Sequence, residues 1–274
     1  MMKNWIVPGL AALALTAALQ TAGAADLPAR MPVKAAPYAA PGYNWYGFYV
    51  GGHVGYGWGN DAVSFTDTTG GYAGLIGTSI PFSAADQPKG MLGGIQWGSN
   101  WQFGQWVLGI DSDFAWTDIH SSETVTIGGG IARTNFVDQK LDWLSTTRAR
   151  AGFLLQPNLM IFGSGGIATG RANVSVANNL VGVACTVGNA CPNDNARDTL
   201  WGWAAGAGIE YATGSWLWRL EYLHYDLGDL TFTYSDRITA STVTASTNFS
   251  GDIVRGAISY KFDWQPLDLI IGRR

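Results

Sequence analysis

The chain has 274 residues and a formal net charge of −4, with 13% charged residues, 13% aromatic residues and 37 glycines. An ordinary soluble domain carries about 25% charged residues and about 7% glycine, so this composition indicates a surface that meets lipid rather than water. The negative net charge argues against a basic surface that binds nucleic acid. No stretch after residue 25 is apolar for the roughly 18 residues that a membrane helix needs. A closed β-barrel is the other structure that can span a bilayer.

The N-terminal residues predict an export signal. Lys3 gives a short positive region, residues 6–19 are largely apolar, and residues 22–24 (Ala-Gly-Ala) supply the small residues that signal peptidase accepts. We therefore predict a cleaved signal peptide over residues 1–24. Residues 25–45 are rich in proline and alanine and show no periodicity, which predicts a flexible periplasmic arm.

From Tyr46 onward, apolar residues alternate with polar or small residues. This period of two is typical of strands whose two faces meet different surroundings. Eight segments of this kind are present, each a little more than ten residues long, which is the reach of a tilted membrane-spanning strand. They are residues 46–58, 90–103, 106–118, 142–155, 159–172, 199–211, 216–227 and 252–262.

The connections between these segments are alternately short and long. The short ones are residues 104–105, 156–158 and 212–215, and the long ones are 59–89, 119–141, 173–198 and 228–251. Outer-membrane barrels have short periplasmic turns and long external loops, whereas a soluble sandwich has no reason to keep every second loop short. The sequence therefore predicts an all-β protein, an eight-stranded antiparallel transmembrane barrel over residues 46–262, followed by a C-terminal extension over residues 263–274.

Aromatic residues lie near the ends of the predicted strands, where barrels carry girdles at the two membrane interfaces. The predicted interfacial aromatics are Trp58, Trp106, Trp116, Trp143, Trp201, Trp216, Tyr260 and Phe262.

Charged residues occupy the opposite face of several strands and would point into the lumen. They are Asp111, Asp113, Arg148, Arg150, Glu210, Arg219, Glu221, Arg255 and Lys261. An eight-stranded barrel is just filled by side chains, and an isolated buried charge is costly. We therefore expect ion pairs that plug the lumen. A charged pore or a proton path is the alternative interpretation.

No group of residues predicts catalysis. Asp111 and Asp113 share a strand face, but no Ser–His or Cys–His arrangement accompanies them, so we expect no enzyme activity. The glycine-rich stretches do not stand between a strand and a helix, as a phosphate-binding loop does. Cys185 and Cys191 lie close together, and in an exported protein this predicts a disulfide within a loop rather than a metal site.

Seven stretches together carry a resemblance to a known family. They are GFYVGGHVGYGWG at 47–59, GGIQWGSNWQFGQWVLGIDSDF at 93–114, WLSTTRARAGF at 143–153, GSGGIATG at 163–170, GWAAGAGIEY at 202–211, WRLEYLHYDLG at 218–228 and VRGAISYKF at 254–262. The chain resembles the RopB-type family of small alphaproteobacterial outer-membrane proteins, which includes haemin-binding and immunogenic surface antigens. All eight predicted strands are covered, and the loops are not. Family chains usually end at the aromatic residue that closes the last strand, here Phe262, whereas this chain continues to Arg274.

These observations favour a structural role in envelope integrity and surface presentation in the outer membrane of a Gram-negative bacterium. A narrow porin for small solutes is one alternative. Surface binding of haem or another ligand is a second, because the resemblance allows His120 or His224 to ligate haem iron. We expect no metal and no obligatory cofactor. The expected partners are outer-membrane lipids, lipopolysaccharide and the barrel-assembly machinery. Residues 263–274 are expected on the periplasmic side, where they fold against the barrel mouth, form a patch at the membrane interface or are frayed.

Overall fold

The computed structural model describes residues 42–59, 63–67, 82–84, 87–127, 133–180, 193–236 and 241–265. Its regular elements are strands, in the order β1 (Gly47–Gly59), β2 (Val63–Asp67), β3 (Phe82–Ala84), β4 (Lys89–Phe103), β5 (Trp106–Ile127), β6 (Arg133–Gln156), β7 (Leu159–Leu180), β8 (Asn193–Thr213), β9 (Trp216–Asp236) and β10 (Ser241–Phe262). Among the described residues, no helix is long and apolar enough to cross a membrane.

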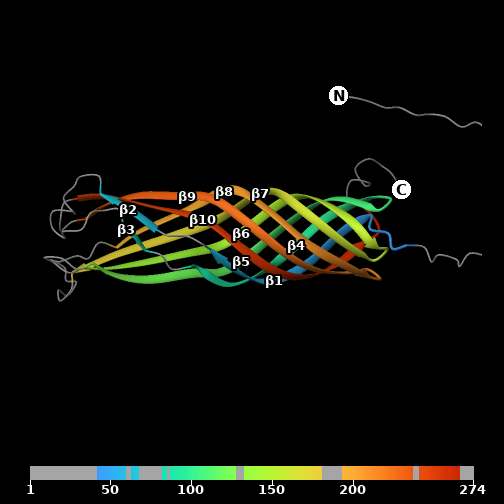
Figure 1. The fold of residues 1–274 in the computed structure, drawn as a ribbon, viewed down its shortest axis with the longest axis horizontal. Coiled ribbons are helices and arrows are strands. Elements are labelled where there is room, and N and C mark those ends of the chain that lie inside the picture. The colour runs from blue at the N-terminus through green and yellow to red at the C-terminus, as the bar shows by residue number, and fades with distance from the viewer. Residues whose placement is uncertain are drawn as a thin grey trace, which may run out of the picture. The chain divides into compact units, whose positions relative to one another are not determined.

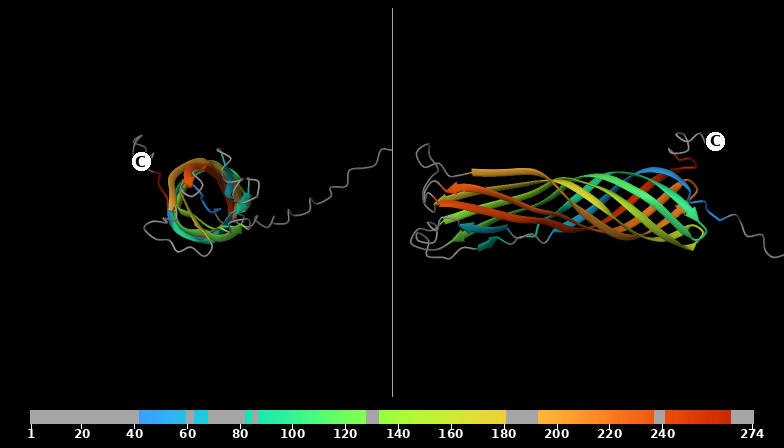
Figure 2. Two further views of the ribbon diagram at one scale, coloured as in Figure 1. Left: turned by 90° about the vertical axis from the view of Figure 1, so that its left-hand side faces the viewer. Right: turned by 90° about the horizontal axis from the view of Figure 1, so that it is seen from above.

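Eight of these strands form a closed ring. The order is β1-β4-β5-β6-β7-β8-β9-β10, each strand antiparallel to the next, and β10 pairs back onto β1 with Phe48 opposite Phe262. The end-on view in Figure 2 shows this ring, and Figure 1 shows its strands crossing the long axis at a tilt. Closure pairs the backbone of the first strand with that of the last, which removes the edges of the sheet. The prediction of an eight-stranded antiparallel barrel is confirmed.

Three tight turns lie at one end of the ring, which we call the turn end. They join β4 to β5, β6 to β7 and β8 to β9. Gly104 and Gly214 sit in the first and third turns with φ angles of 63° and 55°, a backbone conformation that glycine adopts without steric cost. The start of the described barrel chain, drawn in blue, also lies at the turn end (Figure 1). So does its end, where Gln265 bonds to the carbonyl of Asn100.

Burial alternates along the strands as the period of two predicts. On β5, the outward-facing Leu108 and Ile110 are 47% and 50% exposed, whereas the inward-facing Asp111 and Asp113 are 0% and 1% exposed. The apolar face therefore points outward and the polar face points inward, the reverse of a soluble protein.

The strands reach farther from the turn end than the sequence predicted. β5 to β10 are each 21 to 24 residues long, so much of the predicted loops at 119–141, 173–198 and 228–251 is strand. The prediction of loops there was wrong. These stretches are rich in threonine, serine and valine, which pair readily as strands but lack the strong apolar alternation from which the strand boundaries were set. The predicted loop 59–89 likewise contains the hairpin β2–β3, in which β2 pairs with β10 beyond the end of β1.

Three register shifts occur at a similar level of the barrel. They lie at Trp116/Ile119 in the β5–β6 pair, at Leu141/Trp143 in β6–β7 and at Asn248/Ser250 in β9–β10. A bulge bends its strand and increases its twist, and the strands are visibly less tilted on the side away from the turn end (Figure 2, right). The bulges therefore separate a tilted barrel from what we call the extension.

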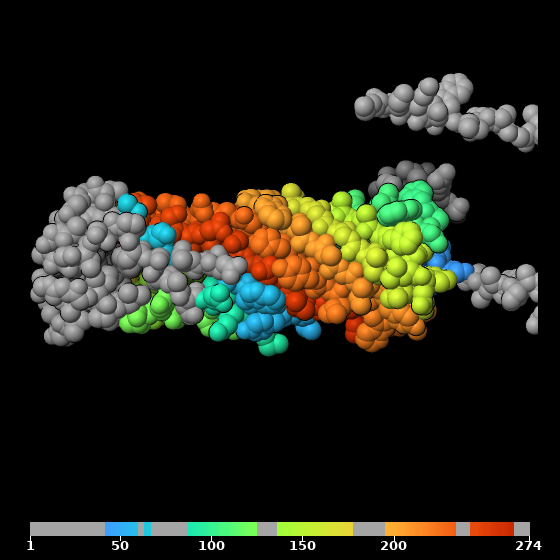
Figure 3. Space-filling model, viewed as in Figure 1, coloured from blue at the N-terminus to red at the C-terminus, as the bar shows by residue number. Residues whose placement is uncertain are grey.

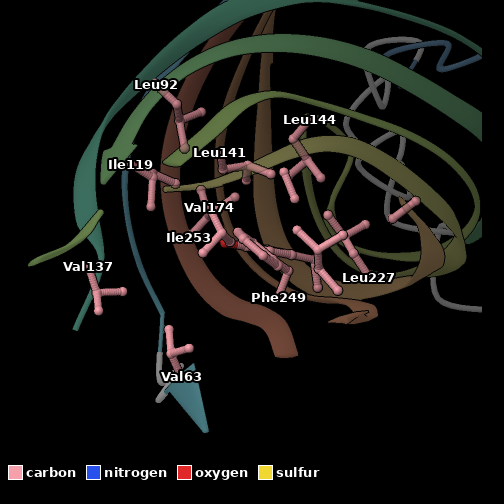
Figure 4. Packing of buried hydrophobic residues seen from close by; sticks show 14 of the residues in the cluster. Val63, Leu92, Ile119, Val137, Leu141, Leu144, Val174, Leu227, Phe249 and Ile253 are labelled. Atoms are coloured by element: carbon pink, nitrogen blue, oxygen red, sulfur yellow. The ribbon is translucent and has the colours of Figure 1, made fainter. Parts of the chain in front are cut away.

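Within the extension the ring opens into two sheets. Pairing between β8 and β9 stops at Trp203 opposite Asp226, although both strands continue. One sheet then consists of β9, β10, β2 and β3, and the other of β5 to β8. Their inward residues form one buried apolar cluster, which includes Val63, Val137 and Val174 (Figure 4). We call it the outer apolar layer.

Candidate functional site

Eight of the nine charged residues predicted to face the lumen come together in its middle. None of the eight is more than 5% exposed. They form what we call the charge cluster: Asp111 and Asp113 on β5, Arg148 and Arg150 on β6, Glu210 on β8, Arg219 and Glu221 on β9, and Arg255 on β10. Residues two apart on a strand share a face, so three of these strands each contribute a neighbouring pair. Four carboxylates meet four guanidinium groups, which makes the cluster formally neutral.

Arg148 is the centre of the cluster. Its Nη1 lies 2.5 Å from Oε1 of Glu221, and its Nη2 lies 3.0 Å from Oδ2 of Asp111 and 3.2 Å from Oδ2 of Asp113. Its Nε donates a hydrogen bond of 3.0 Å to Oγ1 of Thr146. One side chain from β6 thereby joins carboxylates on β5 and β9, which do not neighbour each other in the ring.

Arg255 closes the side of the cluster that faces the outer apolar layer. Its Nη2 lies 3.0 Å from Oδ2 of Asp113 and 2.7 Å from Oε2 of Glu221. Its Nε donates to the same Glu221 oxygen at 2.8 Å. The next inward residue away from the turn end is Ile253 after Arg255 and Leu223 after Glu221. Both belong to the outer apolar layer. The cluster therefore ends abruptly against apolar side chains.

Arg219 and Arg150 form the side nearer the turn end. Nε of Arg219 lies 2.7 Å from Oε2 of Glu210, and its Nη1 lies 2.7 Å from Oδ2 of Asp111. Nη1 of Arg150 lies 3.2 Å from Oε2 of Glu210. Both guanidinium groups also lie over the ring of Phe162, at 5.3 Å and 4.6 Å from its centroid.

Tyr49 belongs to this site although the sequence analysis did not include it. Its hydroxyl donates to Oδ1 of Asp111 at 2.5 Å and accepts from Nη1 of Arg150 at 3.2 Å and Nη2 of Arg219 at 3.1 Å. Its alternation with the outward-facing Phe48 and Val50 already placed it inside the barrel. The predicted lumen network contained only formally charged residues, whereas this neutral hydroxyl bonds to three of them.

Lys261 does not join the charge cluster, and its prediction as a member was wrong. Its side chain is buried near the turn end, where Nζ contacts the carboxylate of Asp263 and donates to the carbonyl of Tyr46 at 3.2 Å. Lys261 is six residues from Arg255 on β10, which corresponds to roughly 20 Å along a strand. It faces the lumen as predicted, but at a different height.

Trp45 fills the mouth of the barrel at the turn end. It is 0% exposed and packs in a cluster with Leu154, Met160 and Leu217. Its backbone N–H donates to Oε1 of Gln102 at 2.8 Å, and its indole N–H donates to a turn carbonyl at 3.0 Å. The sequence assigned Trp45 to a flexible arm, and that is wrong for this residue, because an indole offers more apolar surface to bury than the proline-rich stretch before it.

Tyr43 and the start of the C-terminal extension complete this closure. The ring of Tyr43 lies edge-on to that of Trp45 at 5.1 Å, and burial, together with the nearby carboxylates of Glu210 and Asp263, raises the pKa of the Tyr43 hydroxyl. Gln265 is 1% exposed, and its amide donates to the carbonyl of Asn100 at 2.7 Å. The C-terminal extension therefore folds against the mouth up to this residue. Residues 266–274 lie outside the described chain.

A second set of buried polar groups lines the wall of β1 and β4. Both ring nitrogens of His53, the side-chain amide of Asn100 and Oε1 of Gln96 have no hydrogen-bond partner among the described residues. Nε2 of Gln96 donates to Oγ of Ser259 at 2.8 Å. Buried polar atoms are normally paired with protein or with water, so this wall is suited to hold water.

All eight predicted interfacial aromatics lie on outward-facing positions. Trp106, Trp216, Tyr260 and Phe262 lie close to the turn end, and Trp58, Trp116, Trp143 and Trp201 lie near the level of the bulges. Neighbouring rings contact each other, as between Trp106 and Phe153 at 5.2 Å and between Trp216 and Tyr260 at 5.4 Å. Trp58 lies next to the end of β1 as predicted. In contrast to the prediction, Trp116, Trp143 and Trp201 lie within β5, β6 and β8 rather than at their ends, because those strands continue into the extension.

The two candidate haem ligands are far apart. His120 lies on β5 and His224 on β9, which are separated in the ring by β6, β7 and β8. Nδ1 of His224 lies 2.8 Å from Oδ1 of Asp252. In the described part of the chain, no group of three histidine, cysteine or acidic residues could hold a metal ion. The two histidines therefore cannot ligate one iron together. The predicted disulfide between Cys185 and Cys191 lies outside the described residues.

A family model described as outer membrane protein beta-barrel domain matches residues 9–262. The chain belongs to this family. The 31 kDa outer-membrane immunogenic protein of Brucella melitensis is 33% identical over 267 residues, which cover 95% of this chain and 100% of that protein. The 22 kDa outer membrane protein of Rhizobium leguminosarum is 28% identical over 190 residues, which cover 68% and 66% of the two chains. The solved structure of OprG from Pseudomonas aeruginosa aligns with a TM-score of 0.45 at 11% identity, over 81% of this chain and 99% of that one.

Family membership places the protein in the outer membrane, and the resemblance to small alphaproteobacterial outer-membrane antigens is confirmed. Outer-membrane barrels have short turns on the periplasmic side, so the turn end faces the periplasm and the extension faces the exterior. The two levels of aromatic residues then correspond to the periplasmic and the outer interface of the membrane.

Proposed function

We propose that this outer-membrane protein is a closed, non-catalytic barrel that supports envelope integrity and presents a rigid extension as a surface antigen. The observation that carries this proposal is the charge cluster, which spans the lumen between two apolar layers. A lumen closed in this way favours a structural role over transport.

The stacking of the three layers supports closure. Trp45 and its neighbours fill the periplasmic mouth, and the charge cluster fills the middle. On β9 and β10 the outer apolar layer begins at the next inward residue after the cluster. A solute ion would have to displace paired guanidinium and carboxylate groups and then pass apolar side chains. Both steps are unfavourable, because buried charges without partners and dehydrated apolar constrictions oppose ion passage.

The engagement of the carboxylates supports the absence of catalysis. Asp111 and Asp113 have the spacing of an acid–base pair, but Oδ2 of each contacts at least two guanidinium groups. Such contacts fix a carboxylate in place as an ion-pair partner and leave it no room to approach a substrate. The carboxylates therefore serve to join strands.

The length of the strands supports surface presentation. Beyond the bulges, β5 and β6 continue as a paired hairpin from Ile119 opposite Leu141 to Ile127 opposite Arg133. Paired strands hold their side chains in defined positions, which suits a surface that is recognised by other molecules. The Brucella relative is itself named an immunogenic outer-membrane protein.

A narrow porin is the second candidate, and one observation favours it. The unpaired polar atoms of His53, Gln96 and Asn100 form a file along one wall, beside the charge cluster. Water in this file would give a thin polar path from the periplasmic side. Leu92, one inward position beyond Gly94 on β4, belongs to the outer apolar layer and lies across the outward continuation of that path.

Sensitivity of a deletion strain tests the envelope role. We expect cells without this protein to become more sensitive to detergent and to large antibiotics, and the wild-type gene to restore resistance. A deletion strain with normal resistance but slower uptake of small solutes would contradict the structural role and favour the porin.

A further inference from the structure

An apolar groove crosses the lipid-facing wall of the barrel. Its volume is about 1020 Å³, and it passes from the periplasmic ends of β7 and β8 over β9, β10, β1 and β4 to β5. Its rim consists of exposed apolar side chains, of which Val54, Ile95, Trp116, Trp218, Leu220 and Ile258 define the course. Part of this wall, where β9, β10 and β1 lie side by side, is visible in Figure 3.

Three outward-facing glycines form the floor of the groove. A Cβ atom added to Gly52, Gly93 or Gly256 would meet no atom closer than 3.6 Å, 3.7 Å or 4.0 Å. The inward-facing Gly51 and Gly94 differ, since a Cβ there would lie 2.2 Å or 1.9 Å from a neighbouring carbonyl oxygen. Backbone packing requires glycine at the inward positions but not in the groove. The missing side chains on the outer wall therefore leave a hollow and relieve no steric conflict.

The groove follows the hydrogen-bonded rungs of the sheet. Leu220 lies opposite Gly256, Gly256 opposite Val54, and Gly93 opposite Trp116. Neighbouring strands are about 4.8 Å apart, so five steps from β8 to β5 cover roughly 24 Å. Because barrel strands are tilted by about 40°, the groove rises by roughly 15 Å. That is half of the hydrocarbon core of about 30 Å. These rungs start at Ile209, four residues before the end of β8, and finish at Trp116, at the level of the outer aromatic residues, so they cross the half of the core that holds the outer-leaflet acyl chains.

An aromatic and cationic platform adjoins the outer end of the groove. Trp116 lies opposite Trp143, and Trp143 lies opposite Arg171 in the next pair of strands. The guanidinium group of Arg171 lies 5.9 Å from the centroid of the Trp143 ring. Arg171 has no ion-pair partner among the described residues, so its charge is available to an anion at the membrane interface.

Two lysines extend this positive surface. Lys89 and Lys140 lie on either side of His120 in the paired strands β4, β5 and β6. Within the described chain neither lysine has a carboxylate partner, whereas the nearby Asp118 faces His120 at 3.6 Å. Arg171, Lys89 and Lys140 therefore present three cations at the level of the outer-leaflet headgroups, above a groove with the depth of one acyl chain.

We propose that this groove binds one acyl chain of lipopolysaccharide, whose phosphate groups contact Arg171, Lys89 and Lys140. The apolar rim matches the chain, and the cations match the phosphates through charge-assisted hydrogen bonds. Lipopolysaccharide joins several acyl chains to a phosphorylated headgroup in the outer leaflet, so it presents both parts at this height. The site lies on the outer wall and is independent of whether the lumen is closed.

Native mass spectrometry of the refolded full-length protein tests this proposal. The probes are purified deep-rough lipopolysaccharide and phosphatidylethanolamine, which has no net charge. We expect one lipopolysaccharide molecule to be retained with at least tenfold higher affinity than phosphatidylethanolamine. No retained lipopolysaccharide, or equal retention of both lipids, would overturn the proposal.

Filling the groove gives the second arm. Gly93→Leu with Gly256→Leu should reduce lipopolysaccharide binding at least tenfold. The matched control is Gly163→Leu with Gly165→Leu on β7, because these glycines also face outward and a Cβ at either meets nothing closer than 3.9 Å. An equal loss in both variants would mean that lipid coats the barrel without a site. Loss of a dimer with unchanged lipid binding would assign the groove to a second copy of the chain and contradict the proposal.

The headgroup arm uses Arg171→Gln with Lys89→Gln. This variant should lose the preference for lipopolysaccharide while its binding of phosphatidylethanolamine stays unchanged, and a retained preference would overturn the role of the cations. Heat-modifiable gel mobility verifies that each variant is folded. If the leucine variant does not fold, Gly256→Cys carrying a benzophenone label should crosslink to lipopolysaccharide, and Gly163→Cys should not. Equal crosslinking at both positions would contradict the site.

Discussion

Arg148 and Glu221 meet across the lumen, with Nη1 of the arginine 2.5 Å from Oε1 of the glutamate. The two residues lie on β6 and β9, which share no hydrogen-bonded ladder. The backbone holds each strand only to its two neighbours, whereas this pair joins strands three places apart in the ring. The charge cluster therefore stabilises the barrel across its lumen, whereas the hydrogen bonds of the sheet act only between neighbouring strands around the ring.

Glu221→Gln should destabilise the barrel strongly. It leaves Arg148 and Arg255 without their shared carboxylate, and removing one partner of a buried ion pair costs about 3–5 kcal/mol. Urea unfolding in lipid vesicles measures this loss. The control is Asp142→Asn, which breaks the surface pair between Asp142 and Arg197 at 2.6 Å and should cost at most about 1 kcal/mol. If Glu221→Gln costs as little unfolding free energy as Asp142→Asn, water already screens the charge cluster.

Trp45→Ala should also destabilise the barrel, because it empties the periplasmic mouth. Replacing a buried aromatic residue by alanine costs about 3–5 kcal/mol. Trp216→Ala is the comparison, since Trp216 is 51% exposed at the interface and its loss leaves no internal cavity. Urea unfolding of both variants in vesicles tests the assignment. Equal losses would mean that the segment before β1 does not pack in the mouth.

Much of this architecture could be predicted from the sequence. The period of two placed Asp111, Arg148 and Glu221 inside the barrel, and the short turns fixed the order of the strands. The alternation does not show how far along the barrel axis each inward side chain lies. Lys261 has the same alternation as Arg255 but lies at the mouth, because pairing depends on the tilt and stagger of neighbouring strands.

Strand length was underestimated for a related physical reason. Apolar alternation records where a strand meets lipid, and it fades at the bulges near Trp116 and Trp143. Beyond them, hydrogen bonding continues between polar, β-branched residues that carry no lipid-facing pattern. Trp45 and Gln265 were missed as closing residues because each precedes or follows the regular pattern, and only the curvature of the closed ring brings both to the same mouth.

The C-terminal extension should be needed only as far as Gln265. A chain that ends at Gln265 keeps the bond from its amide to Asn100 and the bond from the Phe48 N–H to the carbonyl of Trp264, at 3.0 Å. We expect it to reach the outer membrane in normal yield. A chain that ends at Phe262 loses both bonds. Its free energy of unfolding should fall by about 1–3 kcal/mol, so it should unfold at a lower urea concentration. Heat-modifiable gel mobility and membrane yield compare the two. Normal assembly and stability of the shorter chain would show that Tyr260 and Phe262 suffice for the barrel-assembly machinery.

Cys185 and Cys191 should form a disulfide in the exported protein. Mass spectrometry of the unreduced protein should find a mass two hydrogens below that of the dithiol. Because the pair would close only a short ring outside the membrane, reduction should change the urea midpoint of the barrel little. Two free thiols in protein isolated from the outer membrane would contradict the prediction.

Single-channel recording in planar bilayers tests the closed lumen most directly. The refolded wild-type protein should insert without steady conductance, because the charge cluster and the two apolar layers block the path of a hydrated ion. Folding and insertion are verified on the same sample by heat-modifiable mobility. A steady, ohmic conductance from folded wild-type protein would contradict the plugged barrel and would assign the unpaired polar wall of His53, Gln96 and Asn100 to a pore.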